Sequence, residues 1–215
     1  MGFYDLHIEA NDKDVIKMAK QLGFDGIAVV NPEIKSDEIE IISCAMIKVN
    51  SKEELNNEIE KYRNKVELIM VYGGNYEINK AACEDNRVDI LCHPELGRND
   101  SGLDHVCVKS AMENNVAIEI NFNSVLNSKN RPRMLSYLRR NISLCKEYNA
   151  KIITVSGAKS KWEMRAPREL ASLSHLLGLD INSAVASLSI IPENIIKINR
   201  EKLSGKRIGD VKIVE

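Results

Sequence analysis

The sequence is poor in several residue types that often reveal a protein's class. Its 215 residues include one tryptophan, three phenylalanines and four histidines, and 30 Lys+Arg almost balance 31 Asp+Glu. No apolar run approaches the roughly 20 residues that a membrane-spanning helix needs, and the N-terminus lacks the basic start and apolar stretch of a signal peptide. We therefore expect no membrane segment. Ordinary shares of hydrophobic (44%) and charged (28%) residues exclude wholesale disorder.

The cysteines do not form a recognisable framework either. There are five of them, an odd number, widely spaced and without a C-x-x-C motif. This spacing argues against a disulfide scaffold or a zinc cage and favours reduced thiols that fill the core. The sequence therefore predicts a cytoplasmic protein.

The balanced net charge hides an uneven distribution along the chain. Residues 1–128 carry 13 Lys+Arg and 23 Asp+Glu, whereas residues 129–215 carry 17 Lys+Arg and 8 Asp+Glu. Within the second part, residues 129–168 hold 11 basic and only 2 acidic residues. Such segregation predicts a polyanion-binding face, with nucleic acid, phosphate ligands or an acidic protein as the open alternatives.

Strand and helix patterns alternate along most of the chain. Short β-branched apolar runs predict eight strands, at 3–9, 26–30, 41–49, 66–72, 88–92, 116–122, 151–156 and 195–198. Helical spacing and capping residues predict helices at 12–22, from 51, at 75–86, at 104–114, from 131, at 167–177 and at 181–188. Strands that are apolar on both faces are typical of a buried parallel sheet.

Eight such units predict an α/β fold of the TIM-like (β/α)8 barrel type, smaller than usual. The link at 31–40 is too short for a full helix, so we expect one degenerate unit. An open doubly wound sheet is the rival, but no G-x-G-x-x-G follows the first strand. We expect a single barrel domain over residues 1–200 and a weakly patterned, mobile tail over 201–215.

Polar side chains gather at the predicted C-terminal strand ends, where barrels bind their ligands. Asp5, His7, His93 and Glu119 could together hold a divalent ion that activates water. However, four histidines in the whole chain are few for a two-metal phosphoesterase. A buried hydrogen-bond network explains the same residues, and it is the reading that we favour.

A second informative segment follows the predicted strand at 151–156. Ser156 and Gly157 end the strand, and four basic residues and the only tryptophan come next: Lys159, Lys161, Trp162, Arg165 and Arg168. Backbone N–H groups beside Lys and Arg are suited to phosphate. Trp162 could stack on a base, but packing on the barrel is the favoured expectation.

Several segments together resemble the archaeal ribonuclease P protein component 3 family, relatives of the eukaryotic thirty-kilodalton RNase P subunit. The matching stretches include Phe3-Tyr4-Asp5-Leu6-His7, Cys92-His93-Pro94, Gly102-Leu103-Asp104-His105 with Lys109, Ala117-Ile118-Glu119-Ile120-Asn121-Phe122, and Arg139-Arg140-Asn141. They continue with Ser156-Gly157-Ala158, Met164-Arg165-Ala166-Pro167-Arg168-Glu169-Leu170 and Pro192-Glu193-Asn194-Ile195-Ile196 with Asn199-Arg200. The resemblance covers nearly the whole chain, in order.

The resemblance implies a subunit of the ribonucleoprotein that removes the 5′ leader from precursor tRNA. It implies that the RNA performs the chemistry with Mg²⁺, and that this chain supplies no catalytic residue and binds no cofactor or metal. The implied partners are RNase P RNA, component 2 in a heterodimer or a dimer of heterodimers, the other protein subunits, and precursor tRNA as the substrate of the complex. The fold is related to PHP-type phosphoesterases, but Asp5-Leu6-His7 stands where that relative has His-x-His.

Basic residues of the second part, together with three positions on an earlier loop and helix, form the candidate RNA-binding set. Its members are Arg98, His105, Lys109, Arg131, Arg133, Arg139, Arg140, Lys159, Lys161, Arg165 and Arg168. Phosphate contacts of this kind give affinity without reading sequence, which suits recognition of a folded RNA. A free-standing PHP-type metal-dependent phosphoesterase is the alternative function.

Overall fold

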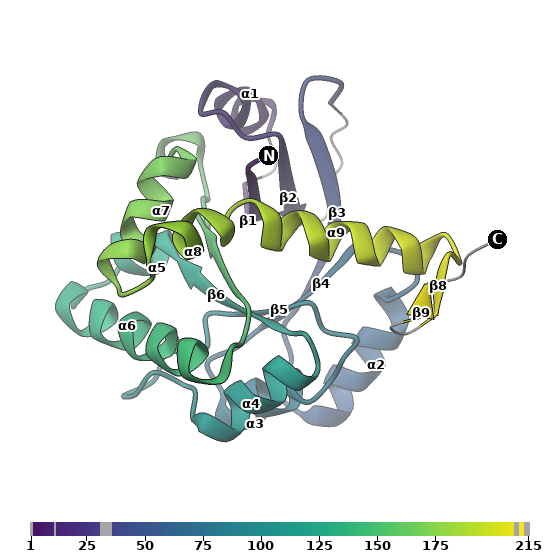
Figure 1. The fold of residues 1–215 in the computed structure, drawn as a ribbon, viewed down its shortest axis with the longest axis vertical. Coiled ribbons are helices and arrows are strands. Elements are labelled where there is room, and N and C mark those ends of the chain that lie inside the picture. Colours follow the sequence, from purple (N-terminus) through teal and green to yellow (C-terminus); the bar gives the residue numbers. More distant parts are fainter. Residues whose placement is uncertain (1, 11, 31–35, 209–210, 213–215) are drawn as a thin grey trace.

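The computed structural model of the chain describes residues 2–10, 12–30, 36–208 and 211–212 (Figure 1). Its main sheet has seven parallel strands in the order of the sequence. They are β1 (Tyr4–Ile8), β2 (Gly26–Val30), β3 (Glu40–Ile47), β4 (Leu68–Tyr72), β5 (Ile90–Cys92), β6 (Ala117–Asn121) and β7 (Ile152–Val155). A small antiparallel pair, β8 (Arg207–Ile208) and β9 (Val211–Lys212), lies near the C-terminus.

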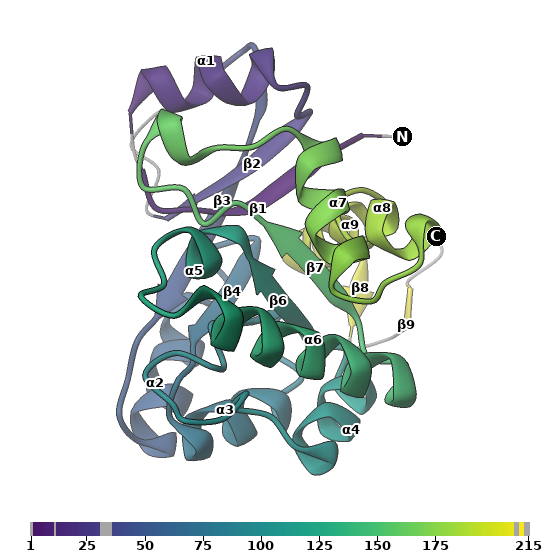
Figure 2. The same ribbon diagram turned by 90° about the vertical axis from the view of Figure 1, so that its left-hand side faces the viewer.

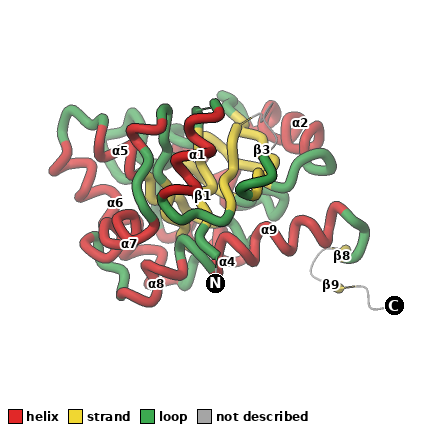
Figure 3. Tube along the Cα trace, turned by 90° about the horizontal axis from the view of Figure 1, so that it is seen from above, coloured by secondary structure: helices red, strands yellow, loops and turns green. Residues whose placement is uncertain are grey.

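Helices connect most of the strands and lie outside them (Figures 2 and 3). They are α1 (Lys13–Gln21), α2 (Lys52–Tyr62), α3 (Tyr76–Cys83), α4 (His105–Glu113), α5 (Phe122–Leu126), α6 (Arg131–Tyr148), the 3₁₀ turn η1 (Lys161–Glu163), α7 (Pro167–Leu176), α8 (Ile181–Ala186) and α9 (Ile190–Leu203). This arrangement confirms the predicted α/β barrel class, in the form of a nearly closed barrel of seven parallel strands.

Successive residues of each strand serve two different parts of the core. On β4, Leu68 and Met70 join a cluster to which all seven strands contribute, whereas Ile69 and Val71 join a second cluster with α2, α3, α4 and α6. The first cluster fills the barrel and the second holds the helices to its outside. Burial of both faces explains why the strands read as continuous apolar runs.

The predicted eighth strand at 195–198 is wrong, because this segment lies in α9. Ile191, Ile195 and Ile196 follow helical spacing, and the last two are buried in the cluster inside the barrel. A short run of isoleucines looks alike in a strand and in a buried helix, and here the packing of one helix face decides.

Polar contacts fasten α9 to the residues at which three strands begin. Asn199 Nδ2 donates to Asp89 Oδ1 (2.8 Å), just before β5. The Arg200 guanidinium donates to Glu40 (2.6 Å), which begins β3, and to Glu67 (2.5 Å), just before β4. The helix therefore covers the N-terminal end of the barrel and leaves the opposite end, the mouth, open for function (Figure 1).

Two other predictions concern segments that the structure describes only in part. The link expected at 31–40 falls partly outside the described residues, which resume at 36, and residues 36–39 contain no helix. The domain boundary placed at residue 200 lies inside α9, which continues to Leu203 before the β8–β9 pair.

The gap between β1 and β7 is closed by backbone contacts rather than by a strand. Near the mouth, Gly157 N donates to His7 O (3.1 Å), and at the other end Tyr4 N donates to Leu188 O (2.8 Å). The Thr154 hydroxyl on β7 also contacts the hydroxyls of Ser174 (2.6 Å) and Ser187 (2.7 Å). These contacts attach α7 and the end of α8 to β7, which among the described strands pairs with β6 on one side only.

We expect Thr154→Val to lower the free energy of unfolding by about 1–3 kcal/mol, because it leaves buried hydroxyls without their partner. Urea denaturation measures the change, and Thr154→Ser, which keeps the hydroxyl, is the matched control. Equal unfolding midpoints for the valine variant and the wild type would show that these contacts do not stabilise the closure.

All five cysteines lie in the described part of the chain, and each is buried with a free thiol. This confirms their predicted role in the core. Burial raises the pKa of the Cys44 and Cys145 thiols to about 12, so both stay protonated. Among the described helices, none has the length and apolar character needed to cross a bilayer.

Candidate functional site

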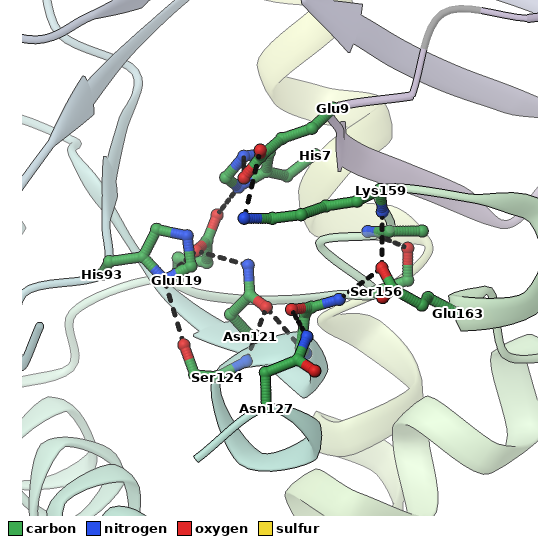
Figure 4. A network of polar contacts seen from close by, with 12 residues as sticks. His7, Glu9, His93, Glu119, Asn121, Ser124, Asn127, Ser156, Lys159 and Glu163 are labelled. Carbon is green, nitrogen blue, oxygen red and sulfur yellow. Dashed lines mark hydrogen bonds and ion pairs between the residues drawn. The ribbon is translucent and has the colours of Figure 1, made fainter. Parts of the chain in front are cut away.

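Two histidines and a glutamate meet at the mouth of the barrel (Figure 4). His7 comes from β1, His93 directly follows β5, and Glu119 belongs to β6. The Glu119 carboxylate lies 2.6 Å from His7 Nδ1 and 3.7 Å from His93 Nδ1, and its side chain is fully buried. The sequence predicted these three residues to converge, because C-terminal ends of neighbouring parallel strands share one end of a barrel.

The pKa values of the two histidines shift in opposite directions. Burial alone would lower the pKa of His7, but the Glu119 carboxylate outweighs it and raises that pKa. Burial would likewise raise the pKa of Glu119, but the two imidazoles reverse the effect and hold it at about 2. Burial dominates at His93 and lowers its pKa. At neutral pH Glu119 is therefore a carboxylate that favours an imidazolium at His7.

A layer of amides and hydroxyls surrounds this pair on the α5 side. Asn121 Nδ2 donates to Glu119 (3.0 Å), and Ser124 Oγ lies 3.0 Å from His93 Nδ1. Asn123 Nδ2 donates to Glu163 (2.8 Å) in the β7–α7 loop. The network thus joins three strand ends and two loops (Figure 4).

Asp5 does not point toward the same centre. Its carboxylate accepts from the backbone N–H of Ser156 (3.1 Å) and so joins β1 to the end of β7. Burial raises its pKa to about 6. One of the four residues in the alternative metal set therefore has a structural role at the β1–β7 gap.

The remaining donors do not fit a two-metal centre. Among the described residues, two groups of three donors have ligand atoms within 4.8 Å of one another: His7, Glu9 and His93, and His7, Cys92 and Glu119. The groups share His7, whose Nε2 is buried without a hydrogen-bond partner. However, the Lys159 ammonium lies 3.5 Å from Glu9 and reaches across the mouth (Figure 4). A lysine here already supplies positive charge beside these donors, and a cation would be repelled by it. We derive no metal-dependent step from this site.

The mouth opens into a cavity of about 380 Å³. It is lined by Glu9, Tyr72, His93, Leu96, Asn123, Ser124, Asn127, Ser128, Met134, Gly157 and Lys159. Gly157 has φ of +63°, and a side chain at this position would overlap the Asn121 carboxamide. The glycine therefore lets the β7 turn approach β6 closely enough to complete the network.

Glu95 is a buried carboxyl group near the mouth. It follows β5, and neither of its carboxylate oxygens has a hydrogen-bond partner. Burial raises its pKa to about 7. In the unfolded chain the group ionises near its usual 4.5, so stability falls as pH rises from about 4.5 to 7.

We expect Glu95→Gln to remove this loss of stability at higher pH. Above pH 7 the variant should be more stable than the wild type by about 3 kcal/mol, and the gain should vanish below pH 4.5. Urea denaturation across this pH range measures it. A difference that does not change with pH would contradict the assignment of a neutral, buried carboxyl group.

The structure places the candidate RNA-binding residues in two groups. One group consists of exposed side chains: His105, Lys109, Arg131, Arg133, Arg139, Arg140 and Arg168. Within it, Lys109 lies 4.0 Å from Glu113 on the same helix, a weak surface pair. Others already have acidic partners: Arg98 with Asp100 (2.6 Å), Lys161 with Asp14 (2.6 Å) and Lys159 with Glu9 (3.5 Å). Arg165 donates to the backbone carbonyls of Trp162 and Met164.

The two basic segments flank α5 on the mouth side of the barrel. Arg131 donates to the Leu126 carbonyl (3.0 Å) at the end of α5, while Asn123 at its start is bonded to Glu163. Arg133 also donates to Asn99 (2.8 Å) in the loop that carries Arg98. The starts of α6 and α7 and the loop at 98–102 are thus linked through α5.

Trp162 does not pack on the barrel, so the favoured expectation for it is wrong. Its side chain is 75% exposed. It lies on the short η1 turn, which projects the indole outward, and local sequence spacing does not reveal such an orientation.

Four residues of the mouth network were not identified from the sequence: Cys92, Ser124, Asn127 and Glu163. Ser124 lies on α5, a five-residue helix that starts directly after β6, and Asn127 is the residue that follows this helix. The run of polar residues immediately after a buried strand was the available signal for them. Glu163 comes from a loop, and nothing in its spacing indicates a partner 40 residues away.

Comparisons with known proteins agree with one another. A family model described as RNase P subunit p30 matches residues 2–204. Ribonuclease P protein component 3 of Methanosarcina barkeri is 35% identical (92% of this chain, 90% of the relative), and that of Methanococcoides burtonii is 37% identical (93% and 89%).

Solved structures show the same fold. A chain in the cryo-EM structure of archaeal ribonuclease P with mature tRNA matches with a TM-score of 0.83 at 28% identity, covering 98% of both chains. Histidinol phosphate phosphatase from Lactococcus lactis, solved with zinc, L-histidinol and phosphate, matches at 12% identity with a TM-score of 0.56 (85% and 94% of the chains) and shows a similar fold alone. The chain therefore belongs to the RNase P p30 family and is a protein subunit of ribonuclease P, the endonuclease that processes precursor tRNA.

Proposed function

We propose that this chain binds and supports the RNA of ribonuclease P, and that the RNA removes the 5′ leader of precursor tRNA with Mg²⁺. The chain supplies no catalytic residue and binds no cofactor of its own. The observation that carries this proposal is the exposed arginine surface of α6 and the start of α7, on a chain whose first 128 residues are acidic. The matching chain in the archaeal enzyme with tRNA supports it.

The polar network at the barrel mouth also supports the proposal that the RNA, and not this chain, performs the chemistry. Its carboxylates are bonded to histidine, amide and ammonium groups, and its donor set does not fit a two-metal centre. A PHP-type phosphoesterase needs a bound metal that activates water. We therefore assign the network to holding the strand ends and loops in place.

Component 2 is expected to dock away from the arginine surface, in a heterodimer or a dimer of heterodimers, with the other protein subunits beside it. Leu176 on α7 and Ile181 on α8 are 67% and 65% exposed and offer apolar contacts. Hydrogen exchange of the complex tests this placement. Protection limited to residues 129–168 would contradict it. We expect the whole complex in the cytoplasm, in line with the reduced cysteines.

Reconstitution tests the proposed function directly. RNase P RNA, precursor tRNA and Mg²⁺ are combined with and without this chain and component 2, and leader cleavage is measured. The chain should accelerate cleavage only when the RNA is present. Turnover of a generic phosphodiester by the purified chain, together with a stoichiometric bound metal, would instead support the phosphoesterase.

A further inference from the structure

The only tryptophan of the chain lies in an unusual environment. Trp162 is the most exposed of the large hydrophobic side chains in the described residues, at 75%. An indole in water forgoes a large favourable burial energy. Tryptophan is enriched at binding interfaces, where its apolar ring meets a partner.

The turn that presents the indole is held in place on both sides. Glu163 accepts from the Asn123 side chain and from the Lys159 backbone N–H, each at 2.8 Å. Met164, two residues after the tryptophan, is buried among the residues that pack under α1. Lys161 Nζ lies 2.6 Å from Asp14 at the start of α1. A platform fixed in this way loses little conformational entropy when a ligand stacks on it.

The surroundings of the indole are cationic. Lys161 Nζ lies 5.2 Å from the centre of the Trp162 ring. The Arg165 guanidinium lies over the Phe122 ring at 4.9 Å and donates to the Trp162 carbonyl. Arg168 is exposed in the first turn of α7. Two carboxylates lie nearby: Glu163 accepts two hydrogen bonds, and Asp14 is paired with Lys161.

We propose that Trp162 is a stacking platform for an unpaired nucleobase, with the adjoining phosphates contacting Arg165 and Arg168. The proposal deepens the proposed RNA-binding function and rests on it. An aromatic face next to basic side chains is the arrangement that binds single-stranded nucleic acid, because every base has a π-face and every nucleotide a phosphate. Single-stranded loops and bulges are also the parts of folded RNA that proteins reach most readily.

A protein partner fits this position less well. Tryptophans at protein interfaces lie at the centre of apolar patches depleted of charge. Here the immediate neighbours are charged, and exposed apolar residues such as Leu176 and Ile181 lie beyond the other end of α7. That helix has 10 residues and is about 15 Å long.

Intrinsic fluorescence tests the proposal without a label, because Trp162 is the sole indole. The full chain is titrated with short single-stranded oligoadenylate, with duplex RNA of the same length, and with RNase P RNA. We expect saturable quenching by the single strand and by RNase P RNA, and little by the duplex, whose bases are already stacked.

Substitutions separate stacking from a structural role. Trp162→Ala should weaken binding of oligoadenylate by roughly 5- to 150-fold, the usual range for loss of one base–aromatic stack, and Trp162→Phe should weaken it less. Ile190→Ala, which truncates another exposed apolar side chain at the start of α9, should bind like the wild type. Thermal unfolding should be unchanged in all three.

Two results would overturn the proposal. The first is wild-type affinity of Trp162→Ala for oligoadenylate and for RNase P RNA, together with no quenching of the wild-type chain by either. The second is quenching by component 2 but not by RNA, which would place Trp162 at a protein interface. In either case the proposed function still stands if reversal of the exposed arginines weakens binding to RNase P RNA. It fails separately if the wild-type chain does not bind that RNA at all.

Discussion

Reversing the charge of Arg139, Arg140 and Arg168 to glutamate is expected to weaken binding of RNase P RNA by roughly 100-fold or more. All three side chains are exposed on α6 and α7. Each charge-assisted contact with a phosphate contributes on the order of 1.5–3 kcal/mol. The log–log dependence of the binding constant on salt should become shallower by about 2 to 3, because each lost contact removes roughly 0.7 to 0.9. A filter-binding or fluorescence titration at several salt concentrations measures both.

The matched control reverses three lysines of the acidic half, Lys52, Lys61 and Lys65, which are exposed on α2 and just after it. It changes the net charge equally, so a difference between the two triple variants reports position and not total charge. Equal affinities of the two triple variants for RNase P RNA would show that the arginine surface is not the RNA-binding face. Two of the control lysines also face carboxylates, Lys52 with Glu84 (3.2 Å) and Lys61 with Glu58 (3.4 Å), and exposed pairs of this kind contribute little to stability.

Most of the fold could be predicted from the sequence because its signals are local. Apolar runs bounded by capping residues and glycines mark the seven strands and the helices around them. The segment at 195–198 is different, since its helical state depends on Asp89, Glu67 and Glu40, which lie far away in sequence. Only the closed barrel brings these residues beneath α9.

The candidate site, like the fold, could be predicted only in part from the sequence. Convergence of His7, His93 and Glu119 follows from the direction of parallel strands and needs no further information. Lys159 points into the barrel mouth and Trp162 points out into solvent, and both orientations depend on how one loop folds. Charge and hydrophobicity alone would predict an exposed lysine and a buried tryptophan. Loop conformation follows from contacts with Asn123 and Glu9, which local spacing does not encode.

The second large effect is expected at the buried ion pair, on stability and not on cleavage. His7→Ala leaves the Glu119 carboxylate fully buried without its closest partner, which should cost about 3–5 kcal/mol of unfolding free energy. His93→Ala should cost less, because its imidazole lies 3.7 Å from the carboxylate instead of 2.6 Å. Reconstituted leader cleavage, assayed at a temperature where both variants are folded, should stay close to the wild-type rate.

The pH dependence of the stability lost in His7→Ala tests whether His7 and Glu119 form an ion pair. Glu119 has a lowered pKa, so its contribution is present above its usual 4.5 and is lost as pH falls toward 2. His7 has a raised pKa, so its contribution is present below its usual 6.5 and is lost as pH rises through the raised value. The stability difference between wild type and His7→Ala should therefore be largest between about pH 4.5 and 6.5.

His7→Gln separates this explanation from catalysis, because its amide can still donate to Glu119 while it cannot carry the charge of an imidazolium. We expect it to recover part of the lost stability, with cleavage unchanged. If instead all three variants fold and bind RNase P RNA normally but cleave several hundred-fold more slowly, the histidines act in the chemistry. The division of roles between RNA and protein would then have to be abandoned in favour of a catalytic barrel mouth.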